Sequence, residues 1–305
     1  MSKQIRIGTR KSPLALWQAN FIETKITALG YNAKIVLVES SGDKDLTTPL
    51  YEIGTQGIFT KTLDTALLNN QVDIAVHSLK DVPTALPNGL VLAAVPLRAN
   101  ALDTLVYKNE KPNQNNYTIA TSSLRRKAQW LHKYPQHHID NIRGNVNSRL
   151  EKLENNEAWN GAVFAEIGLQ RLGINPENKE VLDWMIPSPA QGALGVVCRE
   201  NESEIENICS QLNHQNSNIE VHIERLILRA CFGGCTLPLG AFAKINNSEV
   251  SIIANITSLD GKRMVKINET VVLTNAEEIA DEVAKKLLNN GGQEILDTIN
   301  QSKND

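Results

Sequence analysis

Val72-Asp73-Ile74-Ala75-Val76-His77-Ser78-Leu79-Lys80-Asp81-Val82-Pro83 is the stretch of the chain that decides the fold. Its first half is mostly apolar and rich in β-branched residues, which predicts a buried strand over residues 72–77. Polar residues follow at once, and Pro83, Pro87 and Gly89 then break the chain into a loop. The stretch therefore predicts a buried strand with a charged loop at its carboxyl end.

Strand-like and helical segments alternate on both sides of this stretch. Ser12 before Pro13 predicts a helix start, and Gly30 is expected just past the end of that helix. The first unit is expected to have strands at 4–9, 34–38 and 72–77, and helices after Pro13 and at 58–69. A second unit, beginning near residue 98, is expected to have strands at 117–120, 137–142 and 161–166, and helices after Ser123 to about 133 and at 145–155. Such alternation predicts βαβ units and mostly parallel sheets.

The pattern changes after residue 215. A helix at about 218–230 is followed by three alternating segments at 241–246, 249–257 and 264–272. A last helix is predicted at about 276–289, and Thr274 with Glu277 is a candidate capping box at its start. Strands in series followed by a helix predict a smaller α+β domain with an antiparallel sheet.

Composition sets the limits on function. The chain has 305 residues and a mass of 33.7 kDa, enough for two or three domains. A net charge of −3 argues against a nucleic-acid partner, and the absence of a long apolar run argues against a membrane span. The N-terminal residues contain no apolar signal region, so a cytoplasmic location is expected. Four cysteines do not make a disulfide scaffold, and their spacing with the histidines makes no metal site.

Charge is unevenly distributed along the chain. Residues 200–305 carry a net charge of −7, whereas residues 121–149 contain six basic side chains and one acidic side chain. A local basic patch on an acidic protein favours a small anionic ligand, while a merely solvated face is the other interpretation.

Two stretches could carry chemistry in the α/β units. The loop after the deciding strand places Lys80 beside Asp81, a pairing suited to acid/base work, although an exposed polar turn fits equally well. Thr121-Ser122-Ser123-Leu124-Arg125-Arg126 begins a helix, where hydroxyl and backbone N–H groups bind anions. Its arginines lie in the first turn, where the helix dipole disfavours cations, so they predict a carboxylate or phosphate ligand.

Two further motifs are weak when taken alone. Arg143-Gly144-Asn145 follows a strand and enters a helix, and Arg149 lies six residues after Arg143. Gly233-Gly234-Cys235 presents a thiol in a glycine-rich loop, but a lone cysteine is more often inert. Phosphate-loop, dinucleotide-binding, nucleophile-elbow and zinc-protease signatures do not occur in the sequence.

Together these motifs resemble the porphobilinogen deaminase (hydroxymethylbilane synthase) family. Five segments carry the resemblance in order: residues 7–15, 77–83, 121–126 with 143–145, 191–193, and 233–235. The resemblance implies an enzyme that joins four porphobilinogen molecules head to tail with loss of ammonia and then releases hydroxymethylbilane by hydrolysis. It implies a dipyrromethane cofactor bound through a thioether to Cys235, with Asp81 as the catalytic acid/base.

The resemblance also implies a fold and a set of contacts. Two α/β domains like the lobes of type II periplasmic binding proteins are expected at 1–97 plus 193–213 and at 98–192, with a C-terminal α+β domain at 214–305. Contacts to the cofactor are expected from Lys80, Ser78, Thr121, Ser122, Ser123, Arg125, Arg126, Gly144, Asn145 and Gln191. Contacts to the substrate are expected from Arg10, Ser12, Phe59, Arg143, Arg149 and Arg171. Bidentate arginines suit a chain that carries many carboxylates.

The sequence departs from the family pattern at a few positions. Glu52 and Gln56 stand where lysines are common, while Phe59 matches the family. Glu166 stands where small residues usually line the cofactor region, and its carboxylate could either repel the cofactor or pair with an arginine.

Rival interpretations remain beside the enzyme. A periplasmic-type binding protein would be expected to have a signal peptide and would not need the Gly-Gly-Cys loop. A degenerate relative that binds tetrapyrrole without turnover is separated from the enzyme by the turnover of porphobilinogen. The family resemblance suggests a monomer that needs no metal.

Overall fold

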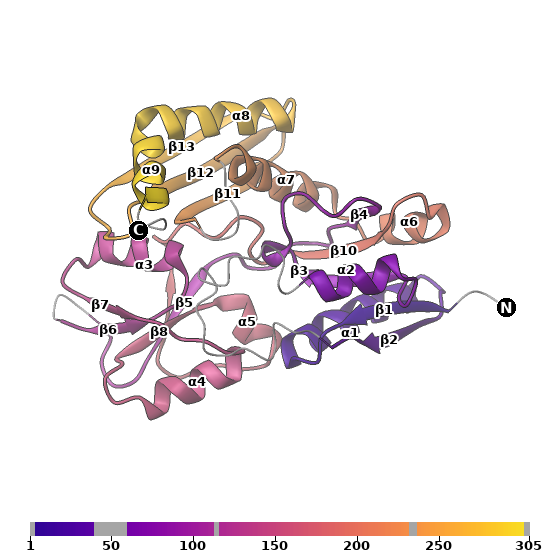
Figure 1. Cartoon of the computed structure of the whole chain (residues 1–305), viewed down its shortest axis with the longest axis horizontal. Coiled ribbons are helices and arrows are strands. Elements are labelled where there is room, and N and C mark those ends of the chain that lie inside the picture. The colour runs from indigo at the N-terminus through magenta and orange to yellow at the C-terminus, as the bar shows by residue number, and fades with distance from the viewer. Residues whose placement is uncertain (1–3, 40–59, 113–115, 232–236, 302–305) are drawn as a thin grey trace.

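Three sheets organise the chain, as a computed structural model shows over residues 4–39, 60–112, 116–231 and 237–301 (Figure 1). The first two sheets have five strands each and the third has three. This arrangement confirms the expected class of two α/β units followed by a smaller α+β unit. In Figure 1 the C-terminal unit lies above the other two, which stand side by side.

The first sheet has the strand order β2-β1-β3-β10-β4. Its strands are β1 (Ile5–Thr9), β2 (Ala33–Leu37), β3 (Ile74–Ser78), β4 (Leu90–Ala94) and β10 (Leu194–Arg199). Strand β1 runs parallel to β2 and β3, but β10 runs antiparallel to β3 and β4. The sheet is therefore mixed, and the expectation of a mostly parallel sheet is wrong. The reason is that β10 enters from the second unit, so its direction is set by the returning chain.

Helices cover both faces of this sheet. They are α1 (Pro13–Ala28), α2 (Lys61–Leu68) and α6 (Ser203–Ser210). Because successive side chains of a strand face opposite sides, Ile74 and Val76 of β3 pack against α1 while Ala75 packs against α2. Strand β3 is thus buried on both faces, as its apolar sequence predicts. The predicted N-cap is confirmed, since the Ser12 side chain accepts a hydrogen bond from the Ala15 N–H at 3.3 Å.

The second sheet has the order β7-β6-β8-β5-β9 and is also mixed. Its strands are β5 (Asp103–Tyr107), β6 (Thr118–Ala120), β7 (His138–Asp140), β8 (Gly161–Ala165) and β9 (Lys179–Leu182). Strand β6 pairs in parallel with β7 and β8, whereas β5 is antiparallel to β8 and β9. Its helices are α3 (Leu124–Lys133), α4 (Val146–Asn155) and α5 (Glu166–Arg171).

The C-terminal unit is an antiparallel sheet covered by helices, as predicted. Its strands are β11 (Leu239–Asn246), β12 (Glu249–Thr257) and β13 (Met264–Val272), and its helices are α7 (Gln215–Ala230), α8 (Ala276–Leu287) and α9 (Gln293–Gln301). The predicted capping box at Thr274 is wrong. Asn275 is the N-cap of α8, because its side chain accepts from the backbone N–H of Glu277 at 2.8 Å.

The chain crosses between the first two sheets twice, and the two crossings touch. The Ala99 N–H donates to the Gly192 carbonyl at 3.3 Å, and Arg98 Nε donates to the Gln191 carbonyl at 2.9 Å. Residues 98–103 and 186–193 therefore form a pair of adjacent straps between the two sheets. Among the helices of the described residues, none combines the length and apolar character that a membrane crossing requires.

Candidate active site between the two α/β sheets

Strand β3 carries the loop that the sequence singles out. A 3-10 turn, Leu79–Asp81, follows directly at its carboxyl end. Leu79 is fully buried, and its backbone N–H donates to the Ala193 carbonyl at 3.0 Å. The buried residue anchors the turn, so the half-buried Lys80 and Asp81 stand at the edge of the sheet where open α/β folds bind ligands.

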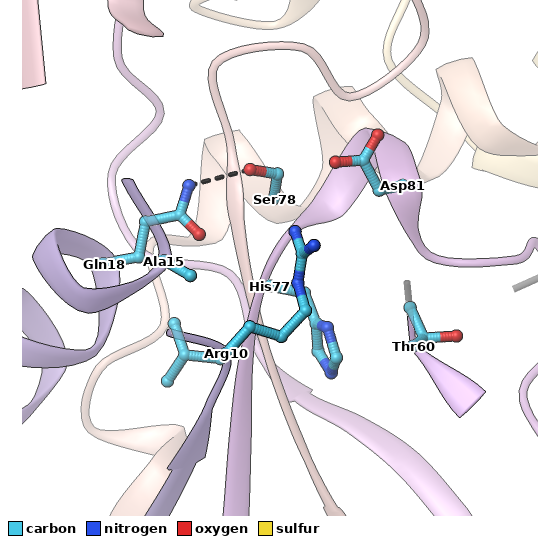
Figure 2. Close-up of a pocket in the computed structure, with 8 residues that line it drawn as sticks. Arg10, Ala15, Gln18, Thr60, His77, Ser78 and Asp81 are labelled. Carbon is cyan, nitrogen blue, oxygen red and sulfur yellow. Dashed lines mark hydrogen bonds between the residues drawn. The ribbon is translucent and has the colours of Figure 1, made fainter. Parts of the chain in front are cut away.

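Asp81 forms one wall of a small pocket over the first sheet (Figure 2). Arg10, Gln18, Thr60, His77 and Ser78 line the same pocket. Gln18 Nε2 donates to Ser78 Oγ at 2.7 Å, which fixes the end of β3 against α1. Burial, and to a smaller extent the charge of Arg10, lowers the pKa of His77 to about 4. This histidine is therefore neutral at physiological pH.

The second sheet contributes two helix starts. Ser123 caps α3 by accepting from the Arg126 N–H at 3.4 Å, and Asn145 caps α4 by accepting from the Ser148 N–H at 2.9 Å. The hydroxyl of Ser122 donates to the Ile142 carbonyl at 2.9 Å and accepts from the same residue's N–H at 3.0 Å. These two bonds hold the loops before α3 and α4 together. Two motifs that lie some twenty residues apart thus form one surface.

The first-turn arginines of α3 pair with an internal carboxylate. Arg125 Nη1 lies 2.7 Å and Arg126 Nη2 lies 2.8 Å from the two oxygens of Asp103, which is fully buried. Burial alone would raise the pKa of Asp103, but the two arginines hold it well below its usual range. The anion that compensates these cations here is therefore Asp103 at the start of β5. The arginines predict a carboxylate or phosphate ligand, and the structure places an internal carboxylate beside them.

Gln191 links this buried cluster to the turn of Asp81. Its Nε2 donates to Asp103 at 2.8 Å and to the Ala101 carbonyl at 2.6 Å, and its Oε1 accepts from Lys80 Nζ at 3.2 Å. Burial, with the charge of Arg126 adding to it, lowers the pKa of Lys80 to about 8, while Asp81 opposes the shift. Side chains from both sheets and from the second strap therefore meet at Lys80.

Further positive charges lie close to Asp81. Arg149 on α4 donates from Nε to the Gly144 carbonyl at 2.8 Å, which folds the arginine back over the helix start. Burial and then the charges of Arg126 and Arg143 lower the pKa of Arg149 to about 10, whereas Asp81 opposes this change. Charges that change the pKa of Arg149 lie close to it. Arg126, Arg143, Arg149 and Asp81 therefore share one region between the two sheets.

Two of the expected contact residues have other partners. Ser12 caps α1. Arg171 at the end of α5 donates from Nη2 to the Gly192 carbonyl at 3.0 Å, and its guanidinium lies over the ring of Trp17 at 5.2 Å from the ring centre. Arg171 therefore joins the second unit to α1 and to a strap, and no described contact brings it to Asp81.

Glu166 is paired, although not with an arginine. Its Oε1 lies 2.8 Å from Nζ of Lys179 and accepts from Gln170 Nε2 at 3.1 Å. The side chain is almost completely buried at the first position of α5. The alternative in which Glu166 pairs with an arginine therefore does not hold, because its partner is a lysine.

Several expected residues lie outside the described part of the chain. They are Phe59, Cys235 and the departures Glu52 and Gln56. Cys231 is described, and it follows the last residue of α7 as a fully buried thiol. Burial raises the pKa of Cys231 to about 12, so this thiol is a poor nucleophile at neutral pH. Within the described ranges, no cluster of three or more His, Cys, Asp or Glu side chains could hold a metal ion.

The main residue that sequence reasoning missed is Asp103. Its signal was available, because it is a lone acid beside Thr104, Leu105 and Val106 in an apolar strand-like run. A charged side chain inside such a run is rarely buried without a partner of opposite charge.

Comparison with known proteins identifies the family. The family described as "Porphobilinogen deaminase, dipyromethane cofactor binding domain" matches residues 5–207, and "Porphobilinogen deaminase, C-terminal domain" matches residues 218–289. The porphobilinogen deaminase of Geotalea daltonii is 38% identical and covers 98% of this chain and 96% of its own length. That of a Chlorobium phaeobacteroides strain is 37% identical and covers 99% of this chain and all of its own length.

The solved structures that resemble the chain are more distant. The methionine binding protein MetQ is 13% identical, with a TM-score of 0.46 over 68% of this chain and 89% of its own length. A likeness at this level carries no argument, so the fold class rests on the strand order and the family on the sequence matches. On those matches, the chain belongs to the porphobilinogen deaminase family, the transferases that make hydroxymethylbilane in tetrapyrrole biosynthesis.

Proposed function

We propose that this chain carries out the family's reaction with Asp81 as the catalytic acid/base and with its dipyrromethane cofactor attached to Cys235. The observation that carries the proposal is the gathering of cations from both sheets around the turn of Asp81. Lys80 belongs to the first sheet, whereas Arg126, Arg143 and Arg149 belong to the second. Cations from both sheets around the half-buried carboxylate of Asp81 suit a substrate that carries acetate and propionate groups.

The residues present fit a dipyrromethane group. Each pyrrole carries an acetate and a propionate, so a two-ring group brings four carboxylates. Arg126 and Arg143 lower the pKa of Arg149, which means that these cations repel one another when no ligand is bound. Carboxylates held among them would remove that repulsion, and guanidinium groups bind carboxylates through two parallel hydrogen bonds. The group would supply the pyrrole carbon to which the first substrate ring is joined.

Asp81 is suited to handle the charge that develops on the substrate. Loss of ammonia from porphobilinogen leaves an electron-poor ring, and a carboxylate beside the pyrrole N–H can stabilise that positive charge and accept the proton. Lys80, next in the chain, places a positive charge beside Asp81. His77 stays neutral and therefore adds no competing charge to the pocket.

We assign the remaining contact residues either to the cofactor or to the substrate. Cofactor carboxylates are assigned to Lys80, Ser78, Thr121, Ser122, Ser123, Arg125, Arg126, Gly144, Asn145 and Gln191. Substrate contacts are assigned to Arg10, Ser12, Phe59, Arg143, Arg149 and Arg171. Arg125 and Arg126 act chiefly through their charge, because Asp103 already occupies much of their hydrogen-bonding capacity.

The domain boundaries, the oligomeric state and the cellular location are also proposals. The domains are 1–97 plus 193–213, 98–192 and 214–305, and they are supported by β10, which lies between β3 and β4 in the first sheet. A monomer in the cytoplasm is proposed. The unpaired thiols of Cys198, Cys209 and Cys231 suit a reducing compartment. Light scattering tests the monomer.

Intact mass spectrometry tests the attachment site. The purified protein is expected to carry the excess mass of two linked pyrroles and to gain further ring masses when porphobilinogen is added. Cys235→Ala is expected to lose the excess. Cys231→Ala is the matched control, because it removes a buried thiol four residues away, and it should keep the excess. Loss of the excess in Cys231→Ala alone would contradict the assignment of Cys235.

Turnover of porphobilinogen tests Asp81. Asp81→Asn is expected to keep the fold and the cofactor mass but to lose turnover. Normal turnover in that variant would remove Asp81 from the mechanism. A wild-type protein that binds tetrapyrrole and shows no turnover would instead be a degenerate relative.

A further inference from the structure

Helix α7 of the C-terminal unit reaches the turn that carries Asp81. Arg225 Nη1 donates to the Val82 carbonyl at 2.8 Å and to the Leu79 carbonyl at 3.3 Å, while its Nη2 donates to the Pro83 carbonyl at 2.6 Å. These carbonyls lie on both sides of Asp81 in the chain. One guanidinium therefore holds the turn Leu79–Pro83 from outside the α/β units.

The neighbouring residue on α7 holds the straps. Glu224 is fully buried and pairs with Arg98 Nη1 at 2.6 Å, and it accepts from the Ala190 N–H at 2.7 Å. It also accepts from the Ala243 N–H of β11 at 2.8 Å. Two adjacent side chains of one helix thus fix both straps and the turn of Asp81 to the C-terminal unit.

Helix α7 also leads to the proposed attachment site. The helix ends at Ala230, and Cys235 follows five residues later. The helix that grips the Asp81 turn thus also precedes, along the chain, the segment to which the cofactor is proposed to attach. We propose that Arg225 is a positioning residue, which holds the Leu79–Pro83 turn so that Asp81 keeps a fixed place relative to the cofactor. This inference rests on the role proposed for Asp81.

The local structure explains why the turn needs an outside support. Its regular part is three residues long, and Pro83 has no N–H with which to extend a backbone ladder. An arginine presents several donors in one planar fork, whereas a lysine presents a single ammonium and cannot span three carbonyls in the same way. A displacement of about 1 Å at a catalytic group can reduce a rate on the order of a hundredfold.

Graded variants at position 225 test the inference. Arg225→Lys keeps the charge and part of the bonding, whereas Arg225→Met keeps the length and removes the donors. Arg229 is the matched control, because it lies one turn further along α7 and is exposed. Each variant is assessed by its cofactor mass, its thermal midpoint, and kcat and KM for porphobilinogen at a temperature far below unfolding.

The expected result is a fall in kcat with a loaded cofactor. We expect Arg225→Met to lose roughly ten- to a hundredfold in kcat with KM changed by less than about twofold. Arg225→Lys should fall between it and the wild type, and Arg229→Met should match the wild type. A purely structural role would lower the thermal midpoint and leave kcat of the folded, loaded enzyme unchanged, and that result would overturn the inference.

Asp81→Asn, measured in parallel, separates the two proposals. If Asp81→Asn is inactive and loaded Arg225→Met has normal kcat, the positioning role fails alone. If Asp81→Asn turns over normally, the catalytic assignment fails, and the positioning role fails with it. If Arg225→Met and Asp81→Asn both lose kcat, the double variant should lose little more than Asp81→Asn alone, because both act through one group.

Discussion

Asp103 is the side chain on which the cationic part of the site depends. It compensates Arg125 and Arg126 and accepts a hydrogen bond from Gln191, which in turn meets Lys80. The arginines were predictable from their motif, and the hydroxyl and glycine positions beside them were too. Asp103 could be suspected as a buried acid from its apolar surroundings, but its pairing with these arginines could not be predicted, because it lies some twenty residues earlier and reaches them only when β5 enters the second sheet. Local patterns identify charged groups but do not identify which charge meets which.

Removal of the Asp103 charge should destabilise the protein strongly. Asp103→Asn leaves two buried guanidinium groups without their counter-charge, which costs on the order of 3–5 kcal/mol. The free energy of unfolding from urea denaturation measures this loss. Asp183→Asn is the control, because Asp183 is exposed in the same unit and should change stability by less than about 0.5 kcal/mol.

The pH dependence of that loss has a definite sign. The pKa of Asp103 is lowered in the folded state, so its stabilisation is complete above the pKa of an unfolded aspartate, about 3.9. It is lost only as the pH falls through the folded pKa. The difference between wild type and Asp103→Asn should therefore stay constant from pH 7 to about pH 5 and shrink at lower pH. A difference that vanishes by pH 6 would contradict an ionised Asp103.

Lys80 should make cofactor loading of the apoenzyme slower at alkaline pH. Burial, with Arg126 adding to it, lowers the pKa of Lys80 to about 8, so the cation is lost as the pH rises through that value. The rate at which apoenzyme gains the cofactor mass from porphobilinogen should therefore fall with a midpoint near pH 8. Lys80→Arg keeps its charge and should remove this fall. Lys127→Arg, on α3, is the control and should keep the fall in loading rate near pH 8. If Lys80→Arg showed the same midpoint as the wild type, the fall would belong to another group.

At the scale of single elements, helix starts were the most predictable feature. Ser12, Ser123 and Asn145 all cap helices with their side chains, and each follows a strand end that the sequence also indicates. Capping depends on residues within three positions, so the sequence contains the information. Strand order does not share this property. Strand β10 has an apolar sequence, but its place between β3 and β4 depends on a chain that first builds the second sheet.

A substitution at Gly144 tests whether the start of α4 tolerates a side chain at this position. Its φ of +117° lies in the region that favours glycine, and a Cβ there would meet the Ser148 side chain that helps to cap α4. Gly144→Ala should therefore lower the free energy of unfolding by about 2–3 kcal/mol, which is more than backbone strain alone would cost. It should also weaken cofactor loading, because Arg143 and Arg149 would move. Urea denaturation and intact mass measure the two effects.

Gly30→Ala is the control for the strain. Gly30 has a φ of +89°, and no atom lies within 4 Å of the added Cβ, so only the backbone term remains. This variant should lose about 1–2 kcal/mol and load its cofactor fully. Equal losses of stability in both variants would mean that the contact with Ser148 costs nothing.

At the scale of the whole molecule, polar side chains join the three units. Arg98, Glu224 and Gln191 are nearly or completely buried where the straps meet the C-terminal unit. The large apolar cores, by contrast, stay within single sheets and their helices, and only a small cluster packs Leu79, Val82 and Ala190 against Val221 of α7 among the described residues. Hydrophobic periodicity therefore predicts each unit separately. It predicted the fold class of each unit and the order of the units along the chain. It carries little information on their mutual placement, which depends on charge pairs and on a small apolar contact between residues distant in sequence.

Glu224 should control how firmly the straps are held. Glu224→Gln removes the counter-charge of Arg98 and can satisfy fewer of the groups that now bind its two oxygens, the Ala190 and Ala243 N–H groups among them. Hydrogen exchange should therefore become faster in both straps, residues 98–103 and 186–193. Glu220→Gln is the matched control, because Glu220 is buried one turn earlier and accepts from the Ile245 N–H within the C-terminal unit. That variant should speed exchange near Ile245 and leave the straps unchanged. Unchanged exchange at Ala190 in Glu224→Gln would mean that packing, rather than this carboxylate, joins the C-terminal unit to the active site.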